Sequence, residues 1–154
     1  IVQESIALID AQLKKHQVEV VYALEQEPAI LCDAHQIQQV VVNLLLNAME
    51  AMPQGGRIEL SARLQVSDDP ARNRVIFQCR DQGTGIAPEH LATIFNPFFT
   101  TKADGTGLGL SIVHKILEQH RAQVDVVSNE TGTTFLLSFP VAQATEPPCT
   151  DIPF

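Results

Sequence analysis

The sequence has few cysteines, and their spacing indicates neither a bridge nor a metal site. Cys32, Cys79 and Cys149 are an odd number, and no two of them form a CxxC pair. This pattern predicts neither a disulfide framework nor a zinc site. Sparse, unpaired cysteines favour a reducing cytoplasm as the compartment of the protein.

Long apolar runs and an excess of basic residues are also absent. No run approaches the roughly 20 apolar residues that a membrane-spanning helix needs. Acidic residues outnumber basic ones by 18 to 10, which gives a formal charge of −8. Because this charge repels a phosphate backbone and an anionic membrane surface, we expect no nucleic acid partner and no direct membrane contact.

What is present is the composition of one globular domain. The 154 residues are 45% hydrophobic and 18% charged, which is enough for a single hydrophobic core, and no internal repeat is visible. Ile1 stands inside an amphipathic pattern without an initiator methionine or a signal peptide, which predicts a piece of a longer chain. After Pro140 prolines replace the periodicity, so we expect a domain over residues 1–140 and a loose tail over 141–154.

Hydrophobic periodicity predicts a mixture of helices and strands. Asp33 and Gln36 have the spacing of a capping box, in which each side chain binds the other's backbone N–H at the start of a helix. The strands should pair mostly as antiparallel hairpins, so we expect an α+β fold, a two-layer α/β sandwich with helices on one face of the sheet. The pattern predicts helices at 2–15, 34–52, 88–94 and 110–117, and strands at 18–24, 29–32, 58–66, 75–81, 123–128 and 133–139.

Glycines gather in two short loops, DQGTG at 81–85 and GTGLG at 105–109, which hold five of the eight. A glycine-rich loop that leads into a helix presents several backbone N–H groups to an anion such as phosphate. The second loop does lead into a predicted helix. Glycine loops also serve simply to turn a chain, so the loops alone leave both interpretations open.

Three polar side chains lie close to these loops or to the long helix. Asn43 and Asn47 stand four residues apart, on one face of the helix at 34–52. An asparagine oxygen together with nucleotide phosphates is an adequate magnesium site. Taken alone, the pair is more typical of two helix asparagines that face solvent. Asp81 ends a buried strand, where its carboxylate could accept a hydrogen bond from an amine or form an Asx turn.

Five motifs occur in one order: QVVVNLLLNAMEAM, DQGTGI, FNPFFTTK, GTGLGLSIV and GTTF. Together they resemble the N, G1, F, G2 and last-strand motifs of the catalytic domains of histidine kinases in the GHKL superfamily. The resemblance covers roughly residues 33–140. It implies a Bergerat-type sandwich that binds Mg-ATP between the helix of the first motif and a mobile lid at about residues 96–106.

The resemblance also implies a role for individual residues. Asn47 would bind magnesium, and Asn43 would lie beside it near the phosphates. Asp81 would receive the adenine N6 amine. Lys102, in the lid, would approach the phosphates, so Asn43 and Lys102 are the candidate catalytic residues.

The remaining nucleotide contacts come from the loops and the last strand. The glycines of the second loop would wrap the phosphates, two leucines would anchor that loop, and Thr133 would hold a water beside the adenine. Gly85 would leave room for the base, and Phe95, Phe98 and Phe99 would pack the lid onto the core. The further candidate nucleotide-binding residues are Gly83, Ile86, Gly105, Thr106, Gly107, Leu108, Gly109 and Leu110.

Three positions depart from what many of these kinases have. Asn96 stands where many have Glu, and Arg121-Ala122 stands where many have glycines. Glu50 stands where many have Lys or Arg, although Glu there also resembles the subgroup related to nitrogen-regulation sensors. None of these changes removes a predicted nucleotide ligand.

A histidine kinase needs a phosphoacceptor histidine, usually followed by an acidic residue. The histidines are His16, His35, His90, His114 and His120, and none is followed by Asp or Glu. We therefore expect the acceptor on an upstream dimerisation domain, and His114 and His120 to be packing or surface residues.

The resemblance implies the ATP-binding half of a two-component protein-histidine kinase. It would use ATP and Mg²⁺ and would be cytoplasmic. Its parent would be a homodimer with a response regulator as partner. The alternatives are a degenerate nucleotide-binding adaptor module, and a GHKL ATPase or serine-directed kinase.

Overall fold

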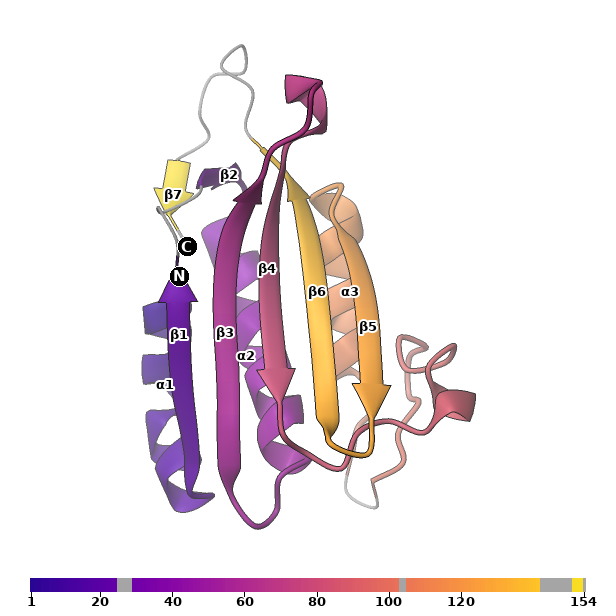
Figure 1. The fold of residues 1–154 in the computed structure, drawn as a ribbon. Coiled ribbons are helices and arrows are strands. Elements are labelled where there is room, and N and C mark those ends of the chain that lie inside the picture. The colour runs from indigo at the N-terminus through magenta and orange to yellow at the C-terminus, as the bar shows by residue number, and fades with distance from the viewer. Residues whose placement is uncertain (25–28, 103–104, 142–150, 154) are drawn as a thin grey trace.

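The strands with alternating hydrophobicity join one five-stranded sheet, in the order β1-β3-β4-β6-β5. The computed structural model describes residues 1–24, 29–102, 105–141 and 151–153 (Figure 1). Its elements are α1 (Val2–Lys15), β1 (Val18–Leu24), β2 (Ala29–Leu31), α2 (Ala34–Glu50), β3 (Gly56–Gln65), η1 (Pro70–Arg72), β4 (Arg74–Asp81), η2 (Pro88–His90), α3 (Gly109–Gln119), β5 (Gln123–Asn129), β6 (Gly132–Pro140) and β7 (Asp151–Pro153).

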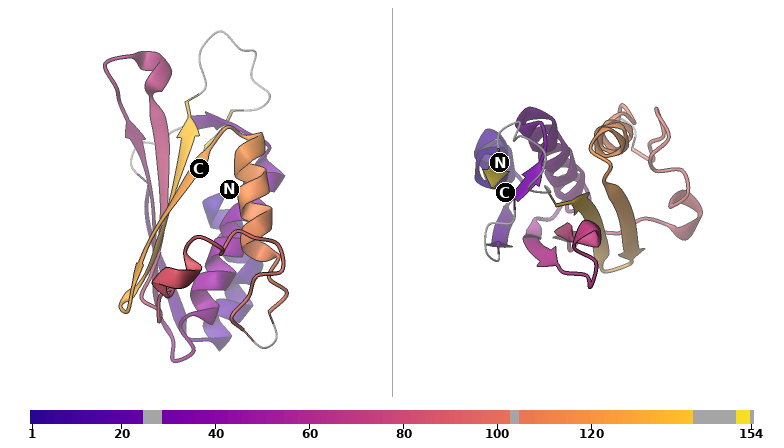
Figure 2. Two further views of the ribbon diagram at one scale, coloured as in Figure 1. Left: turned by 90° about the vertical axis from the view of Figure 1, so that its right-hand side faces the viewer. Right: turned by 90° about the horizontal axis from the view of Figure 1, so that it is seen from above.

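The sheet is mixed and mostly antiparallel. Strands β3, β4, β6 and β5 pair antiparallel in turn, and only β1 runs parallel to its neighbour β3 within the sheet. The α-helices α1, α2 and α3 all lie on one face of the sheet (Figure 2). The predicted two-layer sandwich is therefore confirmed, with its core between the sheet and these helices.

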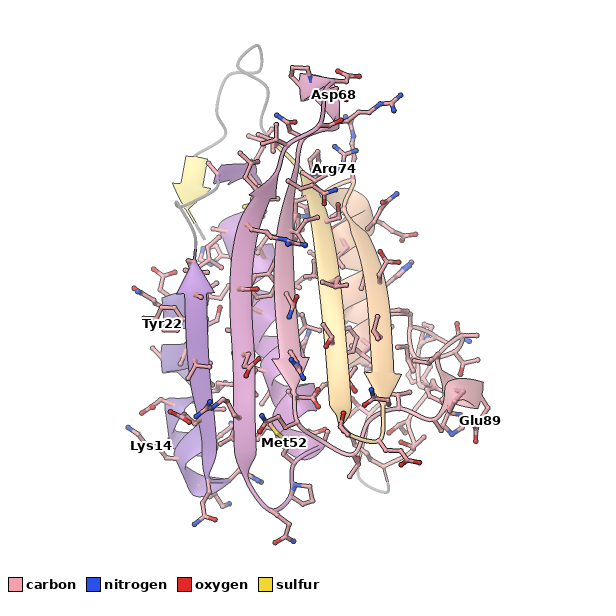
Figure 3. The ribbon with its side chains drawn as sticks, viewed as in Figure 1. Lys14, Tyr22, Met52, Asp68, Arg74 and Glu89 are labelled. Carbon is pink, nitrogen blue, oxygen red and sulfur yellow. The ribbon has the colours of Figure 1, made fainter. Side chains whose placement is uncertain are left out.

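Alternation along the strands decides which side chains enter this core. In β4 the side chains of Val75, Phe77 and Cys79 are buried, whereas the residues between them are less covered. Burial raises the pKa of the Cys79 thiol, so this cysteine is inert in the core. Figure 3 shows Met52 where α2 leads into β3 and Glu89 on the segment that projects beyond β5.

The start of α2 has one of the two side-chain bonds of the predicted capping box. Oδ1 of Asp33 accepts hydrogen bonds from the backbone N–H groups of His35 and Gln36, at 2.9 and 3.1 Å. The reciprocal bond of a capping box is absent among the described residues, because the Asp33 N–H donates to Nε2 of His120 at 3.0 Å. Nδ1 of His120 lies 2.8 Å from the Ile116 carbonyl oxygen, so this nitrogen carries the hydrogen and the ring joins α3 to α2.

Two other predictions differ from the structure. Residues 88–94 form a 3₁₀ turn at Pro88–His90 and further turns, since the bonds here run three residues back and the Thr93 hydroxyl donates to the His90 carbonyl. The tail was expected to be loose, yet Asp151–Pro153 pairs antiparallel with β2 and supplies its backbone with partners. Residues 142–150 of the tail, Cys149 included, lie outside the described residues.

Candidate nucleotide site

Asp81 lies at the end of β4 and is only 3% exposed. Oδ1 accepts hydrogen bonds from the backbone N–H of Gly83 at 2.8 Å and of Thr133 at 3.1 Å. The first of these bonds is an Asx turn, which was one of the two expected interpretations. Burial raises the pKa of the Asp81 carboxyl, and the two N–H groups oppose that rise. Both bonds use one oxygen, so Oδ2 has no partner among the described residues and is left for a donor such as an amine.

The loop after Asp81 is packed tightly against two other parts of the chain. A Cβ at Gly83 would lie 2.6 Å from the Cβ of Ala51, which caps the C-terminus of α2. A Cβ at Gly85, where φ is +74°, would lie 1.9 Å from the carbonyl oxygen of Asn129, the last residue of β5. Gly85 was predicted to leave room for a base. The close approach of the Asn129 backbone is a second reason why a glycine is needed at this position.

Ser128 is a residue of this site that the sequence did not predict. Its hydroxyl accepts a hydrogen bond from the N–H of Ile86 at 2.8 Å and lies 2.9 Å from the hydroxyl of Thr133. Ser128 therefore holds the glycine loop against the last hairpin and orients Thr133 beside Asp81. Nothing in its local sequence distinguishes it from an ordinary strand residue.

Asn43 and Asn47 face the beginning of α3. A Cβ placed on Gly109, the first residue of α3, would lie 3.8 Å from Oδ1 of Asn43 and 3.8 Å from Nδ2 of Asn47. The Nδ2 atoms of both asparagines are buried and have no hydrogen-bond partner among the residues that the structure describes. A buried donor without a partner costs about 1–3 kcal/mol, so these two N–H groups are available to a ligand.

The predicted lid begins with an unusual turn. Phe98 has a φ of +66°, and its N–H donates to the carbonyl oxygen of Gly107 at 2.9 Å. Gly107 has a φ of +67°, and a Cβ there would lie 2.4 Å from the Phe98 carbonyl carbon. This backbone contact directs the Phe98 side chain outward, where it is 75% exposed, so the prediction that it packs the lid onto the core was wrong. Phe95 and Phe99 do pack against the core.

Lys102 does not point into open solvent. Its ammonium group forms an ion pair and hydrogen bond with the Glu50 carboxylate, which ends α2. Gly105 and Thr106 are exposed, while Leu108 and Leu110 are partly covered. Residues 103–104 of the predicted lid lie outside the described residues. The structure thus brings the lid to the same end of α2 that carries Asn47 and contacts Gly83.

The side chains present fit a nucleotide with magnesium. Each asparagine amide offers an N–H donor for a phosphate oxygen and a carbonyl oxygen for a hard cation. In the described part of the chain no three His, Cys, Asp or Glu side chains gather as a metal site. A magnesium ion here would therefore be shared between Asn47, phosphate oxygens and water, which is its usual mode of binding.

Within the described ranges, no helix has the length and apolar character to cross a membrane.

Comparison with protein families agrees with this geometry. The family described as "Histidine kinase-, DNA gyrase B-, and HSP90-like ATPase" matches residues 32–143. Sporulation kinase E of Bacillus subtilis is 36% identical over 148 residues, which are 95% of this chain and 19% of that kinase. The chain thus spans about a fifth of the length of this relative.

Solved structures show the same fold. The nucleotide-free catalytic domain of the histidine kinase ThkA superposes with a TM-score of 0.79 and 30% identity, over 91% of this chain and 90% of that one. ThkA in complex with the response regulator TrrA superposes with a TM-score of 0.75 and 26% identity, over 94% of this chain and 40% of that one. Full-length ShkA in complex with AMPPNP superposes with a TM-score of 0.77 and 28% identity, over 94% of this chain and 30% of that one.

Proposed function

Because the chain belongs to the family of histidine kinase-, DNA gyrase B- and HSP90-like ATPases, we propose that it binds Mg-ATP and presents the γ-phosphoryl group to a histidine of an upstream dimerisation domain. One observation carries the proposal. The Nδ2 atoms of Asn43 and Asn47, buried and without a partner in the described part of the chain, lie near the first residue of α3. The C-terminal end of the same helix packs against the loop after Asp81. The asparagines would bind the phosphate chain of the nucleotide, and Asp81 would bind its adenine.

Each part of the ligand then has a partner of matching chemistry. Oδ2 of Asp81 would accept the adenine N6 amine, and the asparagine amides would bind phosphate oxygens and magnesium. Magnesium, when bound, would neutralise the charge that develops on the transferred phosphoryl group. The site residues would place the nucleotide for in-line attack, which is the main protein contribution to such a transfer.

The partners of the whole protein follow from the same family. We propose a homodimeric two-component kinase in which this domain acts on the dimerisation domain and a response regulator receives the phosphoryl group. The complex of the similar kinase ThkA with the response regulator TrrA supports the last step. A cytoplasmic location, where ATP is available, is part of the same proposal.

Titration calorimetry with Mg-ADP tests the site. Asp81→Asn exchanges an acceptor for an amide that can present donors to the N6 amine, so the affinity should fall about tenfold or more. Asp125→Asn removes the same charge at an exposed position of β5 and should leave the affinity unchanged. Equal affinity of the folded Asp81 variant and the wild type would refute the assignment of Asp81.

A further inference from the structure

The contact between Glu50 and Lys102 joins the lid to the body of the domain. In the described ranges it is the only ion pair and the only side-chain hydrogen bond between residues 97–107 and the rest of the chain. A backbone bond from the Phe99 N–H to the Asn96 carbonyl, three residues back, is part of the local turn. The remaining hydrogen bonds that the described part of this segment makes lie within it, such as the bond from the Gly105 N–H to the Lys102 carbonyl. This ion pair is therefore well placed to decide where the lid rests.

The position of Glu50 explains why it requires a cation. Glu50 is the last residue of α2, and the last turn of this helix contains no basic residue. A carboxylate at the negative end of a helix dipole is unfavourable, and a nearby ammonium group offsets that cost. Lys102 supplies the ammonium from 52 residues further along the chain.

Glu50 also lies next to the proposed phosphate site. It follows Asn47 by three residues on α2, and side chains with this spacing are neighbours on a helix surface. Lys102 in its contact with Glu50 is thus within one helical turn of the amide that is proposed to bind magnesium. A short movement of the lysine side chain would bring its ammonium group to a phosphate oxygen.

The ion pair is exposed enough to exchange partners. The side chains of Lys102 and Glu50 are 41% and 50% exposed, and exposed pairs of this kind contribute little to stability. A phosphate carries more negative charge than a carboxylate and offers several acceptor oxygens. A bound nucleotide can therefore compete for Lys102 without breaking a strong interaction.

We propose that Glu50 is a positioning residue for Lys102, which it holds in the nucleotide-free domain and releases to a phosphate of the bound nucleotide. This inference rests on the proposed nucleotide site. It assigns a function to a glutamate that stands where many related kinases have a basic residue. The ion pair keeps the lid near α2 before the nucleotide binds. When Lys102 exchanges Glu50 for a phosphate, the lid becomes bound to the nucleotide.

Hydrogen exchange without nucleotide tests the resting contact. Glu50→Gln and Lys102→Gln should each speed exchange at the amides of Phe98 and Gly105 by about two- to fivefold, the range expected for an exposed ion pair. The double variant should exchange no faster than either single one. Glu19→Gln breaks the similar exposed pair with Arg57 on β1 and serves as the control with unchanged lid exchange. Unchanged exchange in Glu50→Gln would overturn the resting contact.

Calorimetry with Mg-ADP and with adenosine tests the exchange of partners. Glu50→Gln should bind Mg-ADP about two- to fivefold more tightly, because Lys102 no longer has to break its ion pair with Glu50 before it binds a phosphate. Adenosine has no phosphates, so its affinity should not change. In the Lys102→Gln background, Glu50→Gln should have no effect on Mg-ADP.

The outcomes separate this inference from the proposed function. An equal effect of Glu50→Gln with and without Lys102, or on adenosine as well, would overturn the role of Glu50. So would unchanged or weaker Mg-ADP binding by Glu50→Gln when the wild type binds normally. Failure of the folded wild type to bind Mg-ADP would reject the nucleotide site itself, and this inference with it.

Discussion

At the scale of single residues, the glycines of the first loop are fixed by their neighbours. We expect Gly85→Ala to lower the free energy of unfolding by about 2–4 kcal/mol, because alanine is strained at positive φ and its Cβ would overlap the Asn129 carbonyl. Urea denaturation measures this loss. Gly109→Ala is the matched control, since its Cβ meets only ordinary contacts at 3.8 Å and alanine favours a helix. Equal stability of the two variants would contradict the packing of Gly85.

The buried carboxyl of Asp81 should make the stability of the domain depend on pH. Burial raises its pKa in the folded state, so the ionised carboxylate lowers stability at pH 7, and this cost disappears once the group is protonated in both states. Asp81→Asn should therefore be more stable than the wild type at pH 7. The difference should shrink as the pH falls through the raised pKa of Asp81 towards the ordinary value for aspartate. Thermal unfolding across this pH range measures it, and a difference that grows on acidification would contradict the prediction.

At the scale of elements, the N-terminus of α2 depends on Asp33. We expect Asp33→Ala to destabilise the domain by about 1 kcal/mol, because two backbone N–H groups lose their acceptor. Asp10→Ala removes an exposed i,i+4 pair with Lys14 and should cost less than about 0.5 kcal/mol. Chemical denaturation of both variants tests the cap, and similar losses would show that Asp33 contributes no more than a surface charge.

At the scale of the whole molecule, Asn43 separates a kinase from a hydrolase. In gyrase-like members of the superfamily a glutamate one turn before the magnesium asparagine activates water, and this chain has Asn43 there. An amide cannot take a proton from water at pH 7. We expect negligible ATP hydrolysis by this chain alone, no stable label on its own histidines, and transfer to histidine when the cognate dimerisation domain is added.

Incubation with γ-labelled ATP distinguishes the outcomes. Phosphate release and acid-labile protein label would both be followed, with and without the dimerisation domain. Rapid phosphate release from this chain alone would favour an ATPase. Absence of label even with a competent dimerisation domain would favour a nucleotide-binding adaptor.

Short-range patterns in the sequence predicted most of the fold. The alternation in β3 and β4 and the apolar stripe of α2 predicted these elements, because burial on one face imposes the period of the backbone. The segment at 88–94 was predicted wrongly as a helix, because proline at a first turn is equally compatible with a 3₁₀ turn. Asn43, Asn47 and Asp81 were found from residue type and motif, whereas Ser128 has no local signal.

The sequence by itself determined most of the elements, the glycine loops and the motif order, because these depend on residues that are close in the chain. Only the tertiary structure decided that the Asp33 N–H binds His120, 87 residues away, and that Lys102 binds Glu50. It also turned Phe98 outward through the bond of its N–H with Gly107. These contacts depend on how helices and loops pack together in the folded chain, which no local periodicity specifies.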